Sequence, residues 1–427
     1  MFENFNKDRL LHQARETAKR LISEHGESNA QSIAIKLADL YRQLDLRQRH
    51  EFFNYLASEF NPDPSEVKAI ADAYAREPSA SNLIALCRQT EPRRQELLRR
   101  LNRAPGGTKV IVQMRQELLP LLKDHDPWRV IDADMYHLLS SWFNPGFLEL
   151  HRITWESPAE LLEKIIQHES VHAIDGWDDL RRRLQPDRRC FAFFHRQLPK
   201  EPLIFLEVAL VPSISRDVGA LINKSSPVAE SKTFKTAIFY SISNCQPGLR
   251  GVSLGNFLIK RVAEKLAEEI PSLKVYSTLS PIPGLTRWLD AGAPLENPEV
   301  TESLRRRMDE SIRVLGLPGK TWAERVKAGW RPDQSADKEK QALLSLCAAY
   351  LMFYTTSQRG DNVANFHLSN GATLHQLNWA ADLSNKGLQQ SAGLMVNYLY
   401  ELDKVEEQHE AFSRGQVIRS RNVEKLI

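Results

Sequence analysis

Two histidines and a glutamate form the first group of residues that could do chemistry. His168-Glu169-Ser170-Val171-His172 has the His-Glu-x-x-His spacing. On one helix this spacing puts both imidazoles on one face to bind zinc, with the glutamate as general base. Such a site needs a continuous helix and a third ligand, but Asp175-Gly176 breaks the helical pattern directly afterwards. We therefore expect no metal here, and we expect Glu169 and the two histidines to end a surface helix.

A glycine-containing turn is the second candidate. A β-rich segment runs into Gln246-Pro247-Gly248-Leu249-Arg250-Gly251-Val252-Ser253-Leu254-Gly255, and an amphipathic helix follows. Glycine brings backbone amides close to an anion, and a helix start carries partial positive charge. However, the spacing of Gly251 and Gly255 does not match the dinucleotide fingerprint, and the Gly-Lys-Ser/Thr phosphate-loop signature is absent. The spacing leaves two interpretations open: an ordinary strand-to-helix turn or a diphosphate-binding loop.

The elements that must position these residues change in character near residue 145. The 427 residues suffice for two domains. In residues 1–145, apolar residues recur at helical spacing, as in Leu37, Leu40 and Leu44, and Asp63-Pro64-Ser65-Glu66 has the form of a helix start. This part contains no catalytic pattern, so we expect a helical bundle for packing or oligomerisation.

Residues 146–427 alternate between strand and helix patterns. Ser157-Pro158-Ala159-Glu160 predicts a capped helix start. We expect strands at 191–195, 202–211, 236–243, 275–279 and 372–380, and helices at 254–269, within 301–356 and from 386 onward. The predicted fold is α+β with two domains: an all-α bundle over 1–145, then an α/β catalytic domain over 146–427.

Composition excludes several classes of function. The net charge is +3, from 57 basic and 54 acidic residues, so we expect no nucleic-acid partner; runs such as Arg305-Arg306-Arg307 are typical of solvated helix faces. No segment approaches the roughly 18 to 20 apolar residues of a membrane span, and the first residues lack a signal-peptide pattern. The four cysteines are scattered without metal-ligand spacing. These features favour a cytoplasmic protein.

Beyond these patterns, five segments resemble a known family. The run Arg250-Gly251-Val252-Ser253-Leu254-Gly255-Asn256 resembles the pyrophosphate loop of GNAT acyltransferases. Together with four further segments it is similar to the malonyl-CoA decarboxylase family: FYSIS (239–243), GLRGVSLGNFLIKRV (248–262), STLSPIPGLTRWL (277–289), NFHLSNGA (365–372), and LNWAADLSNKG with GLMVNYLY (377–387, 393–400). The chain departs from the family at Ser253, where the GNAT pattern has glycine and some decarboxylases have glutamate.

The resemblance implies a GNAT-like catalytic fold and a lyase of fatty acid metabolism that converts malonyl-CoA to acetyl-CoA and CO2. No cofactor is implied, because the thioester carbonyl accepts the charge of the enolate. By the same resemblance, the helical domain assembles subunits into a homotetramer.

The resemblance also assigns roles to residues. Ser280 is implied as the hydrogen-bond partner of the substrate carboxylate and formal proton acceptor, and His367 as the proton donor to the α-carbon. Histidine suits this role because its ordinary pKa lies near working pH. Coenzyme A is expected at Arg250, Gly251, Val252, Ser253, Leu254, Gly255 and Asn256, with Ser241, Asn378 and Tyr400 in support. Without the family, a serine before proline is usually a turn or cap, and a lone histidine between Phe366 and Leu368 is usually structural.

Two other functions compete with decarboxylation. A GNAT-type N-acyltransferase would pass an acyl group from coenzyme A to an amine, and it needs an acceptor groove and an amine-activating base. A non-enzymatic coenzyme A sensor would carry the helical domain as a scaffold. Acetyl-CoA formed from malonyl-CoA alone, without an acceptor, separates the decarboxylase from both.

Overall fold

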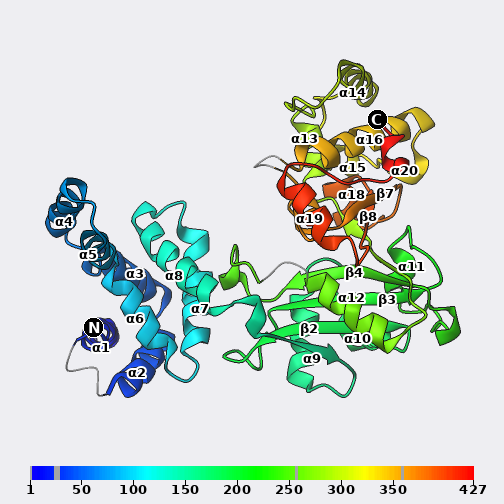
Figure 1. The fold of residues 1–427 in the computed structure, drawn as a ribbon. Helices are drawn as coiled ribbons and strands as arrows, with labels where there is room; N and C mark the ends of the chain where they lie inside the picture. Colours follow the sequence, from blue (N-terminus) through cyan, green and yellow to red (C-terminus); the bar gives the residue numbers. More distant parts are fainter. Residues whose placement is uncertain (1, 24–28, 255–257, 357–359) are drawn as a thin grey trace. The chain divides into compact units, whose positions relative to one another are not determined.

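A computed structural model describes residues 2–23, 29–254, 258–356 and 360–427, which divide into two compact units (Figure 1). The first unit comprises Met1–Glu149 together with Phe194–Leu203 and Cys245–Leu254. The second comprises Leu150–Phe193, Ile204–Asn244 and Gly255–Ile427. The α+β class predicted from the sequence is confirmed.

The first unit is built from helices packed around aromatic and aliphatic side chains. Phe53, Trp128 and Leu139 are fully buried or nearly so. The predicted cap at Asp63 is confirmed, since its carboxylate accepts hydrogen bonds from the amides of Ser65 and Glu66. The helices, blue to cyan in Figure 1, are α1 (Phe2–Leu21), α2 (Ala30–Gln43), α3 (Leu46–Glu59), α4 (Pro64–Arg76), α5 (Ala80–Thr90), α6 (Arg93–Asn102), α7 (Gly107–Leu118) and α8 (Arg129–Trp142).

The α4–α5 hairpin is the exception to this packing. The two helices contact each other, but neither has a buried residue. On α5, Leu83 is 43% and Ile84 51% exposed. An amphipathic helix whose apolar residues are left accessible is typical of a surface that another molecule covers.

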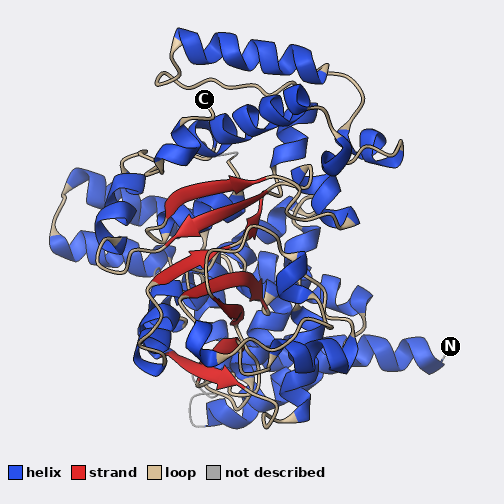
Figure 2. Cartoon of the chain, turned by 90° about the vertical axis from the view of Figure 1, so that its right-hand side faces the viewer, coloured by secondary structure: helices blue, strands red, loops and turns tan. Residues whose placement is uncertain are grey.

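The strands within the described residues form one mixed sheet. Its strands are β1 (Leu148–Ile153), β2 (Arg188–His195), β3 (Ile204–Val211), β4 (Thr236–Asn244), β5 (Val275–Thr278), β6 (Ser280–Pro281), β7 (Thr373–Asn378) and β8 (Met395–Leu399). The order is β1-β2-β3-β4-β5-β8-β6, and β7 also pairs with β8. Figure 2 shows the strands in red with helices around them. β8, near the end of the chain, therefore joins strands from two different parts of the sequence: β5 and β6, which are consecutive, and β7.

Parallel pairing between β4 and β5 is short. It begins at Thr236 and Val275 and ends at Phe239 and Thr278. β4 nevertheless continues to Asn244 along its other neighbour, β3. The last part of β4 thus loses its parallel neighbour at the point where β5 ends.

Helices cover the sheet and carry its connections. Five apolar residues of α12 are buried, and the Arg261 guanidinium of this helix lies 5.1 Å from the centre of the Phe193 ring on β2. The helices are α9 (Ala159–His168), α10 (Gly176–Arg183), α11 (Gly219–Ile222), α12 (Leu258–Glu269), α13 (Leu285–Asp290), α14 (Glu302–Leu315), α15 (Trp322–Lys327), α16 (Asp337–Ala349), a π-helical turn (Tyr350–Tyr354), α17 (Asn362–Ser369), α18 (Asn385–Ser391), α19 (Val405–Ser413) and α20 (Arg421–Glu424).

Two local predictions are wrong. The tail from residue 386 is not only helical, because Met395–Leu399 forms strand β8. The helix after residue 157 exists as α9, but its N-cap is Pro158, which offers no side-chain hydrogen bond. Ser157 instead accepts a hydrogen bond from the amide of Thr154.

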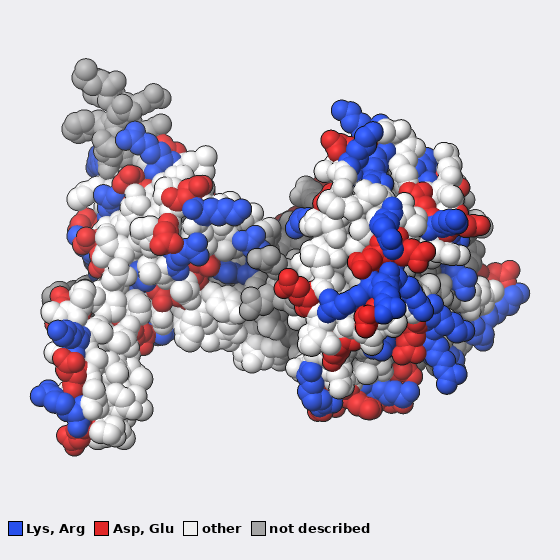
Figure 3. Space-filling model, turned by 90° about the horizontal axis from the view of Figure 1, so that it is seen from above, with Lys and Arg blue, Asp and Glu red and all other residues white. Residues whose placement is uncertain are grey.

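Charge is distributed without a single dominant sign. Figure 3 shows basic and acidic side chains interspersed on the visible face of each unit. Within the described ranges, no helix has the length and apolar character needed to cross a membrane.

Candidate active site

Ser280 and His367, 87 positions apart in the sequence, are brought into direct contact. Ser280 Oγ lies 2.9 Å from His367 Nε2, and the two residues are 5% and 3% exposed. Ser280 begins β6, which is held by β8 through pairing of Ser280 with Val396. His367 is on α17, so a strand and a helix together set this distance.

The Tyr400 hydroxyl determines which atoms donate and which accept in the hydrogen bonds around His367. The Tyr400 hydroxyl lies 2.9 Å from Nδ1, and burial raises the pKa of Tyr400 well above its ordinary value, so the phenol keeps its proton. Nδ1 is the one hydrogen-bond partner of this hydroxyl among the described residues, so we assign the Tyr400 proton to this bond and the ring proton to Nε2. Nε2–H then donates to Ser280, and the Ser280 hydroxyl donates to Thr278 Oγ1 at 3.0 Å.

The imidazole is neutral. Burial lowers the pKa of His367 to about 3, because a charged ring would lose its hydration in this interior. The Tyr398 ring is stacked on it, with centroids 4.6 Å apart. The expectation of a pKa near working pH is therefore wrong, and any proton that His367 delivers comes from the neutral ring.

A cavity of about 230 Å³ opens beside this pair. One wall is the last part of β4, including Ser241, and the other includes Ser280, Pro281 and His367. The cavity lies where β4 has lost its pairing with β5. The sequence-predicted Ser241, Ser280 and His367 thus face one cavity, which is large enough for the acyl end of a ligand.

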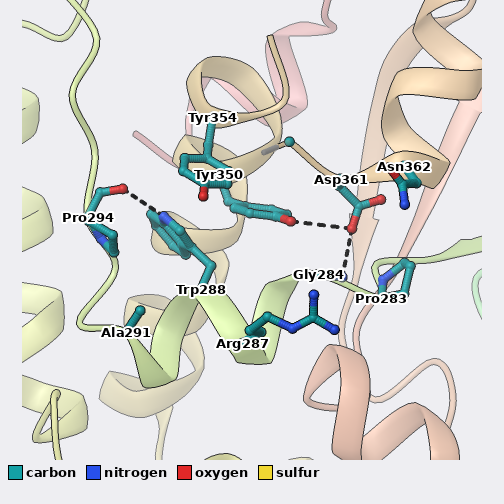
Figure 4. A pocket seen from close by; sticks show the side chains of 11 residues that line it. Pro283, Gly284, Arg287, Trp288, Ala291, Pro294, Tyr350, Tyr354, Asp361 and Asn362 are labelled. Atoms are coloured by element: carbon teal, nitrogen blue, oxygen red, sulfur yellow. Dashed lines mark hydrogen bonds between the residues drawn. The ribbon is translucent and has the colours of Figure 1, made fainter. Parts of the chain in front are cut away.

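Asp361 connects the serine loop to the histidine helix. Its carboxylate caps α17 by accepting from the amides of Val363 and Ala364, and it also accepts from the amide of Gly284 at 2.8 Å. Figure 4 shows the carboxylate between Gly284 and the Tyr350 hydroxyl, at the edge of a second cavity of about 320 Å³. Burial raises the pKa of Asp361, and its four hydrogen-bond donors oppose that shift.

Asn378 lies behind the site rather than in the cavity lining. Its Nδ2 donates to Asn397 Oδ1 at 2.7 Å, and Asn397 Nδ2 donates to the carbonyl of Thr278 at 2.8 Å. Both asparagines are buried. Among the described contacts, Asn378 is therefore connected to Ser280 through Asn397 and the strand segment that precedes the serine.

The predicted coenzyme A loop is described in part. Residues 250–254 belong to the first unit, where Arg115 donates to the carbonyls of Gly248 and Arg250 at 2.8 Å. Gly251 has a φ of 84°, a left-handed conformation that favours glycine. Val252 and Leu254 are buried, whereas Arg250 and Ser253 are exposed. Gly255 and Asn256 lie outside the described residues.

The His-Glu-x-x-His segment is neither one continuous helix nor a surface helix end. α9 ends at His168, so His172 does not share a helical face with it. Glu169 and His172 are 7% and 8% exposed, which corrects the surface assignment, and burial lowers the pKa of His172 to about 4. The described part of the chain holds no group of three or more residues suited to bind a metal ion.

Three site residues escaped the sequence analysis: Thr278, Asp361 and Glu169. Thr278 stands two positions before Ser280, a spacing that places side chains on one face of an extended chain. Asp361 directly precedes a helical segment, which is a cap signal. Glu169 was noticed only as a zinc-site base, yet it accepts hydrogen bonds from Ser241.

Comparisons with known proteins agree over both units. Residues 146–427 match the malonyl-CoA decarboxylase C-terminal domain, and residues 60–143 match the N-terminal domain. Mitochondrial malonyl-CoA decarboxylase of Rattus norvegicus is 37% identical over 380 residues, covering 84% of this chain and 77% of that protein. The protein of the same name from Anser anser anser is 39% identical over 338 residues, 73% of this chain and 64% of that protein.

Solved structures give the same result. Malonyl-CoA decarboxylase from Rhodopseudomonas palustris aligns with a TM-score of 0.84 and 41% identity, covering 98% of this chain and 99% of that one. The enzyme from Agrobacterium vitis aligns with a TM-score of 0.81 and 42% identity, covering 97% and 99%. A two-domain α+β chain with these matches is a decarboxylase, that is, a carboxy-lyase. It belongs to the malonyl-CoA decarboxylase family, as the resemblance predicted.

Proposed function

We propose that this chain converts malonyl-CoA to acetyl-CoA and CO2 without a cofactor. The observation that carries the proposal is the 2.9 Å hydrogen bond between Ser280 Oγ and His367 Nε2 at the wall of a cavity of about 230 Å³. Relatives named malonyl-CoA decarboxylase support the choice of substrate.

The reaction breaks the bond between the carboxylate carbon and the α-carbon. The electron pair moves into the thioester carbonyl and gives an enolate, and CO2 leaves. Such an enzyme must hold the carboxylate out of the thioester plane and place hydrogen-bond donors where charge develops. When substrate binds, in this proposal, the Ser280 hydroxyl turns from Thr278 Oγ1 to donate to the carboxylate, and Nε2–H of His367 leaves Ser280 to face the α-carbon.

A neutral imidazole suffices for the last step. The enolate carbon is a stronger base than the imidazolate nitrogen that the transfer leaves behind, so it takes the Nε2 proton and becomes the methyl group of acetyl-CoA. The negative charge left on the ring is stabilised by the Tyr400 hydroxyl at Nδ1, 2.9 Å away. One proton from the solvent, the proton that the overall reaction consumes, returns to Nε2 after the product leaves.

Coenzyme A binds, in this proposal, through residues 250–256, with backbone amides around Gly251 on the diphosphate. What supports this is the fixed shape of the turn: Gly251 is left-handed, and the Val252 amide closes the turn by donating to the Leu249 carbonyl at 2.9 Å. The glutamate that some family members have at position 253 is replaced here by an exposed serine. Ser241, Asn378 and Tyr400 act as supporting residues.

The test uses malonyl-CoA as the only substrate. We expect wild type to release acetyl-CoA and CO2 in equal amounts, and His367→Ala to lower kcat by about a hundredfold or more, the scale of a lost proton-transfer group. Coenzyme A binding by the variant should remain near that of wild type. His375→Ala, a half-buried histidine on β7 outside the cavity lining, is the matched control and should keep full turnover.

Two outcomes would reject the proposal. Product that forms only after an amine is added would favour the N-acyltransferase. Equal loss of turnover in the His367 and His375 variants would mean that the assigned site is wrong.

We infer that residues 1–145 assemble four copies of the chain and that residues 146–427 carry catalysis. The α4–α5 hairpin supports assembly, because its helices have no buried residue and leave Leu83 and Ile84 exposed. The family resemblance implies that four copies assemble, which makes a homotetramer. We also place the enzyme in fatty acid metabolism and in the cytoplasm, since malonyl thioesters are precursors of fatty acids and the cysteines are few and scattered.

A further inference from the structure

The Glu169 carboxylate lies directly behind Ser241. Ser241 Oγ is 2.8 Å and 2.7 Å from the two carboxylate oxygens. Glu169 is 7% exposed and Ser241 is 2% exposed. Ser241 is on β4 and lines the same cavity as Ser280 and His367. A buried charged group thus contacts the active-site cavity through a single hydroxyl.

The direction of this hydrogen bond is fixed. A carboxylate only accepts, and Oε1 of Glu169 already accepts from the amides of Val171 and His172, both at 2.8 Å. The Ser241 proton therefore goes to Glu169. What Ser241 presents to the cavity is oxygen lone pairs, so it is an acceptor there and not a donor.

The turn that holds Glu169 is itself anchored. Glu169 follows the last residue of α9, and Lys386 of α18 donates to the carbonyls of Ser170 and Val171. Ser243 Oγ lies 3.3 Å from the other carboxylate oxygen, Oε2. These contacts fix the carboxylate from several sides, so it cannot turn away when a ligand enters.

An acceptor at this place selects a particular part of the substrate. The malonyl end has only acceptors, namely its carboxylate and its thioester carbonyl. The nearest donor in a coenzyme A thioester is the amide N–H two carbons from the sulfur. We propose that Glu169 is a positioning residue that makes Ser241 the acceptor for this amide N–H, and so aligns the thioester beside Ser280 and His367; the inference rests on the proposed function.

The test compares two full-length substrates: malonyl-CoA, and its analogue with an ester oxygen in place of that amide N–H. We expect wild type to prefer malonyl-CoA by about tenfold in kcat/KM, the scale of one hydrogen bond. Ser241→Ala should lose most of this preference. Glu169→Gln should lose it too, because the backbone amides keep its Oε1 in place and leave Nε2–H, a donor, facing Ser241.

Non-additivity separates positioning from a general loss of structure. Adding Glu169→Gln to Ser241→Ala should cause no further loss of preference, even where it lowers the Tm. Ser243→Ala is the matched control: this serine is fully buried, lies outside the cavity lining and contacts Glu169 only at 3.3 Å. The amides of Val171 and His172 hold the carboxylate without it, so this variant should keep the preference.

Each failure has its own meaning. Equal kcat/KM for both substrates in wild type, or an unchanged preference in Glu169→Gln, would overturn the inference and leave the decarboxylase intact. If wild type does not turn over malonyl-CoA at all, the proposed function itself is wrong.

Discussion

Both ring nitrogens of His367 are occupied by hydroxyl groups, and this decides the chemistry of the residue. Tyr400 is at Nδ1 and Ser280 at Nε2, each at 2.9 Å. In this buried position the histidine works as a neutral hydrogen-bond donor whose proton position is set by a tyrosine. Substitutions at Tyr400 therefore act on the catalytic atom without removing it.

The low pKa of His367 predicts how stability depends on pH. Because its pKa is about 3 in the folded protein and about 6.5 when unfolded, the unfolded state binds the extra proton as pH falls below 6.5. The histidine thus lowers stability progressively from pH 6.5 down to pH 3. Between pH 7 and pH 5, the free energy of unfolding of wild type should fall by about 2 kcal/mol relative to His367→Asn.

Denaturant titrations at several pH values measure this difference. His172, whose pKa burial lowers to about 4, provides a second variant, His172→Asn, for which the same trend is expected. A difference between wild type and His367→Asn that does not change with pH would contradict a neutral His367.

Ser280 and His367 could be predicted from sequence, but only through family segments. Neither residue type nor spacing identifies them, because serine before proline and a single histidine on a helix are common in any fold. Glu169 illustrates the opposite error. Its spacing suggests the general base of a zinc site. Its burial and its contact with Ser241 depend on where α9 ends, and the sequence alone does not determine that residue.

At the scale of elements, Gly284 keeps the serine loop against the helix of His367. A Cβ at this position would lie 2.1 Å from the Tyr350 hydroxyl and 3.1 Å from Asp361 Oδ2. An added methyl group must therefore push the loop that follows β6 away from the Tyr350 hydroxyl, and with it from Asp361 at the start of α17. Since Ser280 and His367 are on these two elements, their 2.9 Å contact should lengthen.

Gly284→Ala should consequently lower kcat by about tenfold or more and destabilise the fold by about 1–3 kcal/mol, the usual cost of overpacking. Steady-state kinetics and thermal unfolding measure both effects. Gly146→Ala is the control, because its Cβ would meet only the Asn144 side chain at 3.4 Å. Normal kinetics in Gly284→Ala would show that the loop tolerates displacement and does not set the catalytic distance.

Most elements of the second unit were predictable, and the failure at β8 has a physical cause. The strands at 204–211 and 236–244 are β-rich, and the structure confirms them with small changes in their bounds. β8 is buried at four of its five positions, so it lacks the alternation of polar and apolar residues that marks a strand with one exposed face. A short apolar run between helical segments was therefore mistaken for helix.

For the whole molecule, the exposed hairpin predicts the assembly state. Ile84→Glu puts a charge on an apolar surface of the α4–α5 hairpin, where Ile84 is 51% exposed. We expect this variant to form smaller species than wild type in light scattering, with unchanged helix content in circular dichroism. Leu46→Glu, at a leucine on α3 that is 72% exposed, controls for a carboxylate placed on the surface. A wild-type protein that is monomeric at micromolar concentration would disprove the assembly proposal.

The sequence could not predict which segments belong to each of the two units. Phe194–Leu203 and Cys245–Leu254 belong to the first unit although each lies between strands of the sheet. Both segments contain turn residues, but their composition does not indicate which unit a turn packs against, so only long-range contacts reveal the grouping.

The position of β8 has a consequence for how the protein is made. Ser280 is held by a strand that begins 115 residues later, at Met395. During synthesis the ribosome must release residues 281–396 before β6 acquires its partner. We expect a chain truncated before Met395 to contain the serine and the histidine but to lack the strand that holds the serine in place.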